Sequence, residues 1–134
     1  MRFEFLAPYR PQLLSLLRFI TGLLLLQYGI AKIFKFPVLP YFANIPPLIV
    51  AAGTVELVLG ALLMVGLLTR LSAFILSGQM AFAYFLGHMF KTGTPVWLPL
   101  NNGGTAAILF CFTCLYLASA GPGPWSVDAA RGKA

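Results

Sequence analysis

The sequence is dominated by four long apolar segments, at about 13–34, 47–68, 71–90 and 104–120, with short polar or proline-containing stretches between them. A helix of about 20 apolar residues is long enough to cross the hydrocarbon core of a bilayer. Of the 134 residues, 60% are hydrophobic and only 9% are charged, which is too little charge for the surface of a water-soluble domain. We therefore predict an integral membrane protein. Residues 1–134 would form one all-α domain of four spanning helices, with 121–134 as a polar tail.

The basic residues are divided unequally between the two ends of these helices. An even number of spans places both termini on one side, which would hold Arg2, Arg10, Arg70, Arg131 and Lys133, against Lys35 and Lys91 on the other. Because cytoplasmic loops carry the excess of Lys and Arg, both termini are predicted to be cytoplasmic. The basic residues are scattered singly, so the net charge of +6 indicates contact with lipid headgroups and not with nucleic acid.

Small and polar residues recur on one face of each predicted helix, at alternating spacings of three and four residues. In lipid, such residues mark the faces that pack against other helices. The spacing predicts a left-handed four-helix bundle with these faces inside, and glycine-lined faces are also compatible with a homodimer. The four faces are Arg18, Gly22, Leu25, Gly29 and Lys32; Gly53, Glu56, Gly60 and Leu63; Phe74, Gly78, Ala81, Phe85 and His88; and Gly104, Ala107, Cys111, Cys114, Ala118 and Gly121.

Glu56 is an acidic residue near the middle of the second apolar segment, and Gln79 is predicted at a similar depth. An acid at the bilayer centre costs about 2.5–3.5 kcal/mol on insertion scales, so it requires a compensating interaction. One interpretation is a structural ion pair that fixes the helix register, with Arg18 or Lys32 as the cation, and Arg70 is a further candidate for a structural ion pair. The other interpretation is an acid that handles protons or binds a ligand.

His88 is either an interfacial residue with one nitrogen in water or a site residue that donates to a quinone carbonyl. Haem is not favoured, because a second axial ligand would have to come from a methionine or another subunit, and no metal site is expected. Cys111 and Cys114 form a Cys-x-x-Cys sequence in the last apolar segment. Packing is the favoured interpretation of this pair because apolar surroundings make thiols unreactive, and thiol redox chemistry is the alternative.

Several short motifs occur together in this order along the chain. They are Gly29-x-x-Lys32, Glu56 with Gly60, Gly66 and Thr69-Arg70, then His88, Asn102-Gly103-Gly104, and Gly121-Pro122-Gly123-Pro124-Trp125-Ser126-Val127-Asp128. In these residues the sequence resembles the DoxX family of small four-helix membrane proteins, over nearly the whole chain. One departure is Thr105, where the family commonly has Glu.

The resemblance implies a multi-pass protein of the bacterial inner membrane, because the family is named for a subunit associated with a thiosulfate:quinone oxidoreductase. The first hypothesis is a subunit that binds a quinone non-covalently in a polar pocket of Lys32, Glu56, His88, Asn102 and Tyr28. An oxidoreductase partner would supply electrons, and we do not expect this chain to catalyse a reaction alone. The second hypothesis is a non-catalytic membrane assembly or scaffold subunit. The third is a quinone-linked thiol oxidant using Cys111 and Cys114, although the chain has no second cysteine pair to relay electrons.

Overall fold

The computed structural model describes residues 3–40 and 44–133, and these residues form helices and no strand. Four long helices build the fold: α1 (Arg10–Phe34), α2 (Pro47–Val65), α3 (Thr69–Tyr84) and α5 (Thr105–Ala120). The shorter segments are the 3-10 helix η1 (Glu4–Tyr9), the π-helix η3 (Phe85–Met89), α4 (Pro99–Asn102) and α6 (Val127–Ala130). The prediction of an all-α helical bundle is confirmed.

Within the described residues, two helical segments are long and apolar enough to cross a membrane: Glu4–Phe34, which joins η1 to α1, and α2. The apolar helix α5 is shorter, with 16 residues. α2 ends at Val65, before the expected end at residue 68, because Gly66 turns the chain with a φ of 77° and its N–H bonds to the Leu62 and Leu63 carbonyl oxygens. The third apolar segment, predicted over 71–90, is divided between α3 and the π-helix η3.

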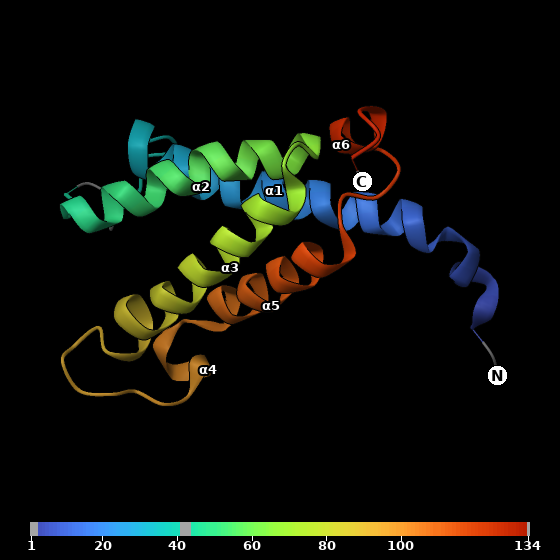
Figure 1. Ribbon diagram of the computed structural model, residues 1–134. Coiled ribbons are helices and arrows are strands. Elements are labelled where there is room, and N and C mark those ends of the chain that lie inside the picture. Colours follow the sequence, from blue (N-terminus) through green and yellow to red (C-terminus); the bar gives the residue numbers. More distant parts are fainter. Residues whose placement is uncertain (1–2, 41–43, 134) are drawn as a thin grey trace.

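The long helices pack as two pairs. α1 lies along α2, α3 lies along α5, and fewer contacts join α2 to α3 or α1 to α5. In Figure 1 the two pairs converge near the turn between α2 and α3 and spread apart toward the loop before α4. Side chains from all four helices still meet in one apolar core, which contains Leu25, Leu63, Leu76 and Leu117. The fold therefore has a tightly joined end and a more open end.

Glycines bring the backbones of α1 and α2 into direct contact. A Cβ atom on Gly22 would lie 2.7 Å from the Gly60 carbonyl oxygen, and one on Gly29 would lie 2.6 Å from the Leu57 nitrogen. Both distances are too short for a side chain, and the obstructing atoms belong to the backbone. The predicted small-residue faces of α1 and α2 therefore form the tightest helix contact in the fold.

The predicted inner faces of α1, α2 and α5 are confirmed, but the face predicted for α3 is wrong. Phe74 and Phe85 are 64% and 49% exposed, and no atom lies within 4 Å of a Cβ built on Gly78. The buried face of α3 is instead formed by Ser72, Ala73, Leu76, Ser77, Met80 and Tyr84. The hydroxyl of Ser77 donates a 2.7 Å hydrogen bond to the Cys111 carbonyl oxygen of α5. The small residues of this buried face, and not those of the predicted face, therefore contact α5.

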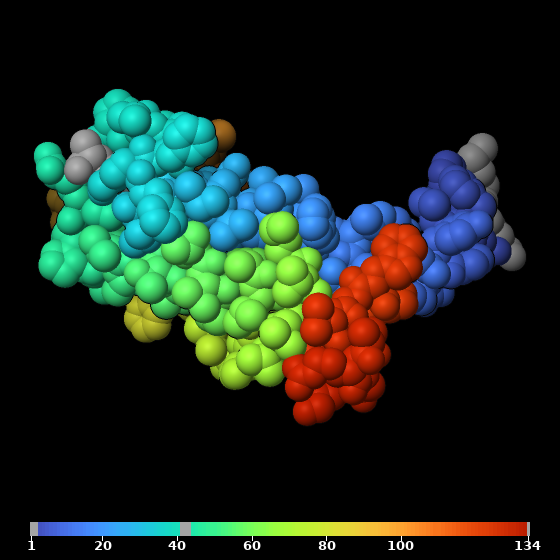
Figure 2. Space-filling model, turned by 90° about the horizontal axis from the view of Figure 1, so that it is seen from above, coloured from blue at the N-terminus to red at the C-terminus, as the bar shows by residue number. Residues whose placement is uncertain are grey.

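The segment after α5, expected only as a polar tail, folds back onto the end of the bundle. Figure 2 shows this segment, in red, against α1 in blue and against the green surface formed by the end of α2 and the start of α3. The Trp125 N–H donates to Ser15 Oγ at 3.1 Å, and the Asp128 N–H donates to the Gly66 carbonyl oxygen at 2.9 Å. Ser126 Oγ accepts a 3.0 Å hydrogen bond from the first turn of α6. The tail thus connects the ends of α1, α2 and α3.

Candidate functional site

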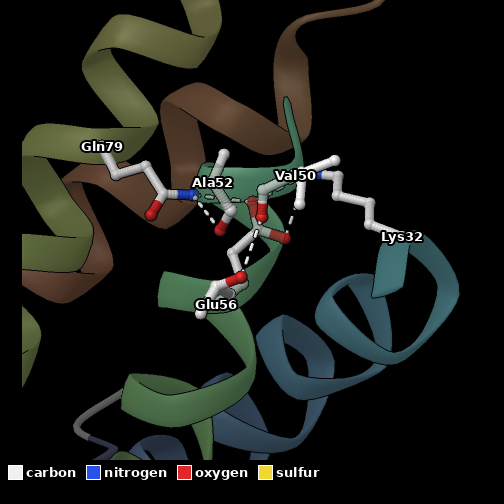
Figure 3. Close-up of polar contacts among 6 residues, drawn as sticks. Lys32, Val50, Ala52, Glu56 and Gln79 are labelled. Atoms are coloured by element: carbon white, nitrogen blue, oxygen red, sulfur yellow. Dashed lines mark hydrogen bonds and ion pairs between the residues drawn. The ribbon is translucent and has the colours of Figure 1, made fainter. Parts of the chain in front are cut away.

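Lys32, Glu56 and Gln79, one each from α1, α2 and α3, form a cluster that we call the polar triad (Figure 3). The Lys32 ammonium donates to Glu56 Oε1 at 2.8 Å and to Oε2 at 3.0 Å, and the Gln79 amide donates to Oε1 at 2.7 Å. Gly53 makes this approach possible, because a Cβ there would lie 2.8 Å from the Lys32 Cβ. Three helices of the bundle are therefore joined at one carboxylate.

Glu56 is buried and Lys32 and Gln79 are half-buried, and one polar atom of the polar triad has no hydrogen-bond partner among the described residues. The Glu56 side chain is 2% exposed and that of Lys32 is 14% exposed. Gln79 uses its amide nitrogen for Glu56 and for the Ala52 carbonyl oxygen, whereas its Oε1 atom is buried without a hydrogen-bond partner among the described residues. A buried acceptor without a donor is costly, so this atom is suited to a ligand or water that carries an O–H or N–H group.

Aromatic residues connect the polar triad to a groove between α1 and α5. The Lys32 ammonium lies 5.9 Å from the centre of the Tyr28 ring, and the Tyr28 ring meets the Phe110 ring edge to face at a centroid distance of 6.4 Å. Phe110 is also one wall of a groove of about 260 Å³, whose other walls include Leu17, Leu24 and Leu109. Tyr28 therefore lies between the charged cluster and Phe110, which lines the groove.

His88 and Asn102, predicted to join Lys32 and Glu56 in one pocket, lie in a second cluster instead. His88 Nδ1 is 3.3 Å from the Asn102 carbonyl oxygen. The Asn102 amide nitrogen donates to the Tyr84 hydroxyl at 3.2 Å and to the Val96 carbonyl oxygen at 2.9 Å, and its Oδ1 accepts from the Gly104 N–H at 2.8 Å. The Asn102 side chain therefore ties together the loop before α5. His88 is nine residues beyond Gln79, roughly 14 Å along the helix axis, because the chain continues through η3.

The two cysteines lie on the inner side of α5. Cys114 is fully buried among apolar residues of the core, and Cys111 is partly buried with its sulfur 3.6 Å from Ser77 Oγ. Both thiols are free. Among residues 3–40 and 44–133, no group of three or more His, Cys, Asp and Glu side chains is placed to hold a metal ion.

The DoxX family model matches residues 13–89, a range that contains all three members of the polar triad and His88. The chain is also 37% identical over 126 residues to a protein of Haemophilus influenzae described as an uncharacterized protein, covering 92% of this chain and 93% of that relative. The chain belongs to the DoxX family. No solved structure matches the sequence of this DoxX protein.

Arg18 and Arg70 of the DoxX protein were expected in structural ion pairs, and here the prediction differs from the structure. Arg18 is 3% exposed and donates to the carbonyl oxygens of Leu63 at 3.0 Å, Trp125 at 2.9 Å and Pro122. Arg70 donates to the carbonyl oxygens of residues 118 and 119 at the end of α5. The last carbonyl groups of a helix lack partners within the helix, and these guanidinium groups supply them.

Asp128 has a structural role that its place in the last sequence motif did not reveal. Its carboxylate oxygens accept from the N–H groups of Leu68 at 3.1 Å and Thr69 at 2.9 Å, which begin α3. Burial alone would raise the pKa of Asp128, but these backbone hydrogen bonds outweigh it, so that the pKa lies below its usual range. The ionised form therefore holds the tail of the DoxX protein against α3.

Proposed function

We propose that this DoxX membrane protein spans the inner membrane four times as a left-handed bundle, with both termini in the cytoplasm, and binds a quinone at the polar triad. The chain would work with an oxidoreductase partner that supplies or removes electrons. Its own residues would bind and orient the quinone ring and hold protons near the ring oxygens. The proposal rests on the buried carboxylate that joins α1, α2 and α3.

The composition of the polar triad supports this choice of ligand. A quinone offers two carbonyl acceptors, and its reduced form offers two hydroxyl donors. The Lys32 ammonium is a donor for a ring carbonyl, whereas the Glu56 carboxylate and Gln79 Oε1 are acceptors for a ring hydroxyl. Because Gln79 Oε1 is buried without a donor among the described residues, the reduced ring is the form that would complete its hydrogen bonding.

The groove between α1 and α5 supports a place for the isoprenoid tail. Its walls are almost entirely apolar, and one of its lining residues, Phe110, contacts the Tyr28 ring. Ligand sites in proteins combine an apolar surface with a few fixed polar groups, which the groove and the polar triad would supply together. The proposed site therefore contains Lys32, Glu56, Gln79 and Tyr28, and leaves out His88 and Asn102.

A scaffold or assembly subunit is the second candidate, and one observation favours it. The buried side chains of Arg18 and Asn102 both donate to carbonyl groups of the same chain. Such residues hold the bundle together without a ligand. We do not extend the proposal to thiol oxidation, because Cys114 is fully buried in the apolar core.

A quinone with a photoreactive group on a short isoprenoid tail tests the proposed site of the tail. The purified protein is irradiated with this probe, and the modified peptides are mapped by mass spectrometry. We expect modification of α1 and α5 near Leu24 and Phe110, and protection by an excess of unlabelled quinone. Modification spread over all helices, or no protection by unlabelled quinone, would contradict the proposal.

A further inference from the structure

A second cavity lies at the tightly joined end of the bundle, away from the polar triad. It has a volume of about 450 Å³, is open to the surface, and is lined by the first turns of α1, the start of α3, the end of α5 and the C-terminal tail. Its walls include Arg10, Leu14, Arg70, Tyr116 and Pro122. The cavity therefore lies where two predicted spans end, which is the level of the lipid headgroups.

The charged residues that line this cavity are both cationic. Arg10 comes from α1 and Arg70 from the start of α3, while Tyr116 of α5 also lines the cavity. None of the described residues that line the cavity is acidic. Two arginines that line one cavity are suited to a phosphate group, because Arg presents several N–H donors in a planar group.

One of the two arginines is held in place by the fold. Arg70 Nη1 donates to the carbonyl oxygens of Ala118 and Ser119, at the end of α5. A Cβ on Gly121 would lie 2.8 Å from Arg70 Nη2, so this glycine leaves the space that the guanidinium occupies. A fixed guanidinium loses little freedom when it binds an anion, which favours a built site over general charge attraction.

We propose that this cavity binds the phosphate group of an anionic phospholipid from the leaflet on the side of the two termini. The phosphate would lie between Arg10 and Arg70. The apolar surface of Leu14 and the ring of Tyr116 would contact the first part of an acyl chain. Charge complementarity selects this occupant, because a zwitterionic lipid would bring a third cation to a cavity that already carries two.

Native mass spectrometry of the whole protein in mild detergent tests the proposal. The protein is titrated with phosphatidylglycerol and with phosphatidylcholine of the same acyl chains. We expect tighter binding of phosphatidylglycerol, weakened about fivefold by Arg10→Gln and about fivefold by Arg70→Gln, with little change for phosphatidylcholine. The Arg10 side chain makes no ion pair or hydrogen bond within the part of the chain that the structure describes, so Arg10→Gln is expected to fold normally.

Two matched variants remove one charge without touching the cavity. Arg131→Gln changes an exposed arginine near the same end, and Lys91→Gln changes an exposed lysine at the other end. Both are expected to bind phosphatidylglycerol as the unaltered protein does. Equal affinity for the two lipids, an unchanged Arg10→Gln, or an equal loss in Arg131→Gln would overturn the proposal. Displacement of the lipid by millimolar inorganic phosphate would also overturn it, since the occupant would then be free phosphate.

Discussion

At the scale of single residues, the Lys32–Glu56 ion pair compensates the charge of a buried carboxylate. Removing one partner of a buried ion pair leaves the other charge uncompensated and costs about 3–5 kcal/mol. We expect Lys32→Met to lower the free energy of unfolding by about this amount, and the double variant Lys32→Met/Glu56→Gln to recover most of the loss. Thermal unfolding in detergent measures both, with Lys91→Met as the control on an exposed lysine. Equal losses in the single and double variants would contradict a stabilising ion pair.

Asp128 gives a prediction about pH. Because its pKa in the folded protein is lower than in the unfolded chain, its contribution to stability is complete above the unfolded value of about 3.9. The contribution is lost as the pH falls through the lower, folded value. We expect Asp128→Asn to have a lower free energy of unfolding than the unaltered protein at pH 6. This difference should shrink when the unfolding of both proteins is measured below about pH 4. A difference that stays constant over this range would exclude the carboxylate as the cause.

At the scale of helices, the contact of α1 with α2 depends on the absence of side chains. A methyl group on Gly29 would meet the backbone of Leu57, which cannot move without displacing α2. We expect Gly29→Ala to destabilise the protein by about 1–3 kcal/mol. Gly78→Ala is the matched control, since no atom lies within 4 Å of its Cβ and alanine is the better helix former. If the two variants unfold at the same temperature, the close contact of α1 and α2 is not correct.

The helices also explain how much could be predicted from sequence. The packing faces of α1 and α2 could be predicted because the glycines within each helix all lie on one face. These glycines are Gly22, Gly29, Gly53 and Gly60. In α3, small residues occur on two faces, and only the contact of Ser77 with α5 decides between them. A pattern within one helix cannot contain that information, since it depends on the partner helix.

The same limit applies to the candidate site. The sequence predicted that a cation, Arg18 or Lys32, would compensate Glu56, because an acid in the membrane is costly. The structure shows that the cation is Lys32. The separation of His88 from Glu56 could have been predicted, because the nine residues from Gln79 to His88 are helical and span roughly 14 Å. The roles of Arg18 and Asp128 could not, since both bind backbone atoms more than 40 residues away in the chain.

At the scale of the whole molecule, the proposed orientation places the tail and the second cavity on the cytoplasmic side. Single cysteines at positions 91 and 133, in a variant with Cys111→Ala and Cys114→Ala, report the orientation in intact cells. We expect an impermeant thiol reagent to label position 91 and not position 133 from outside. Labelling of position 133 alone would reverse the proposed topology and place the Arg10 and Arg70 cavity in the outer leaflet.

The central claim is that the polar triad binds a quinone, and the quinone content of the purified protein tests it most directly. Lipid extracts of protein purified in mild detergent are analysed for quinone, with Glu56→Gln as the variant that keeps the side-chain shape and removes the charge. We predict about one quinone per chain in the unaltered protein, as expected for a single site, and an affinity about tenfold weaker in Glu56→Gln. Gln27→Glu, which adds a charge at an exposed position of α1, should not reproduce that loss if the protein folds. A folded protein that carries no quinone, or equal occupancy in Glu56→Gln, would contradict the claim and favour the scaffold.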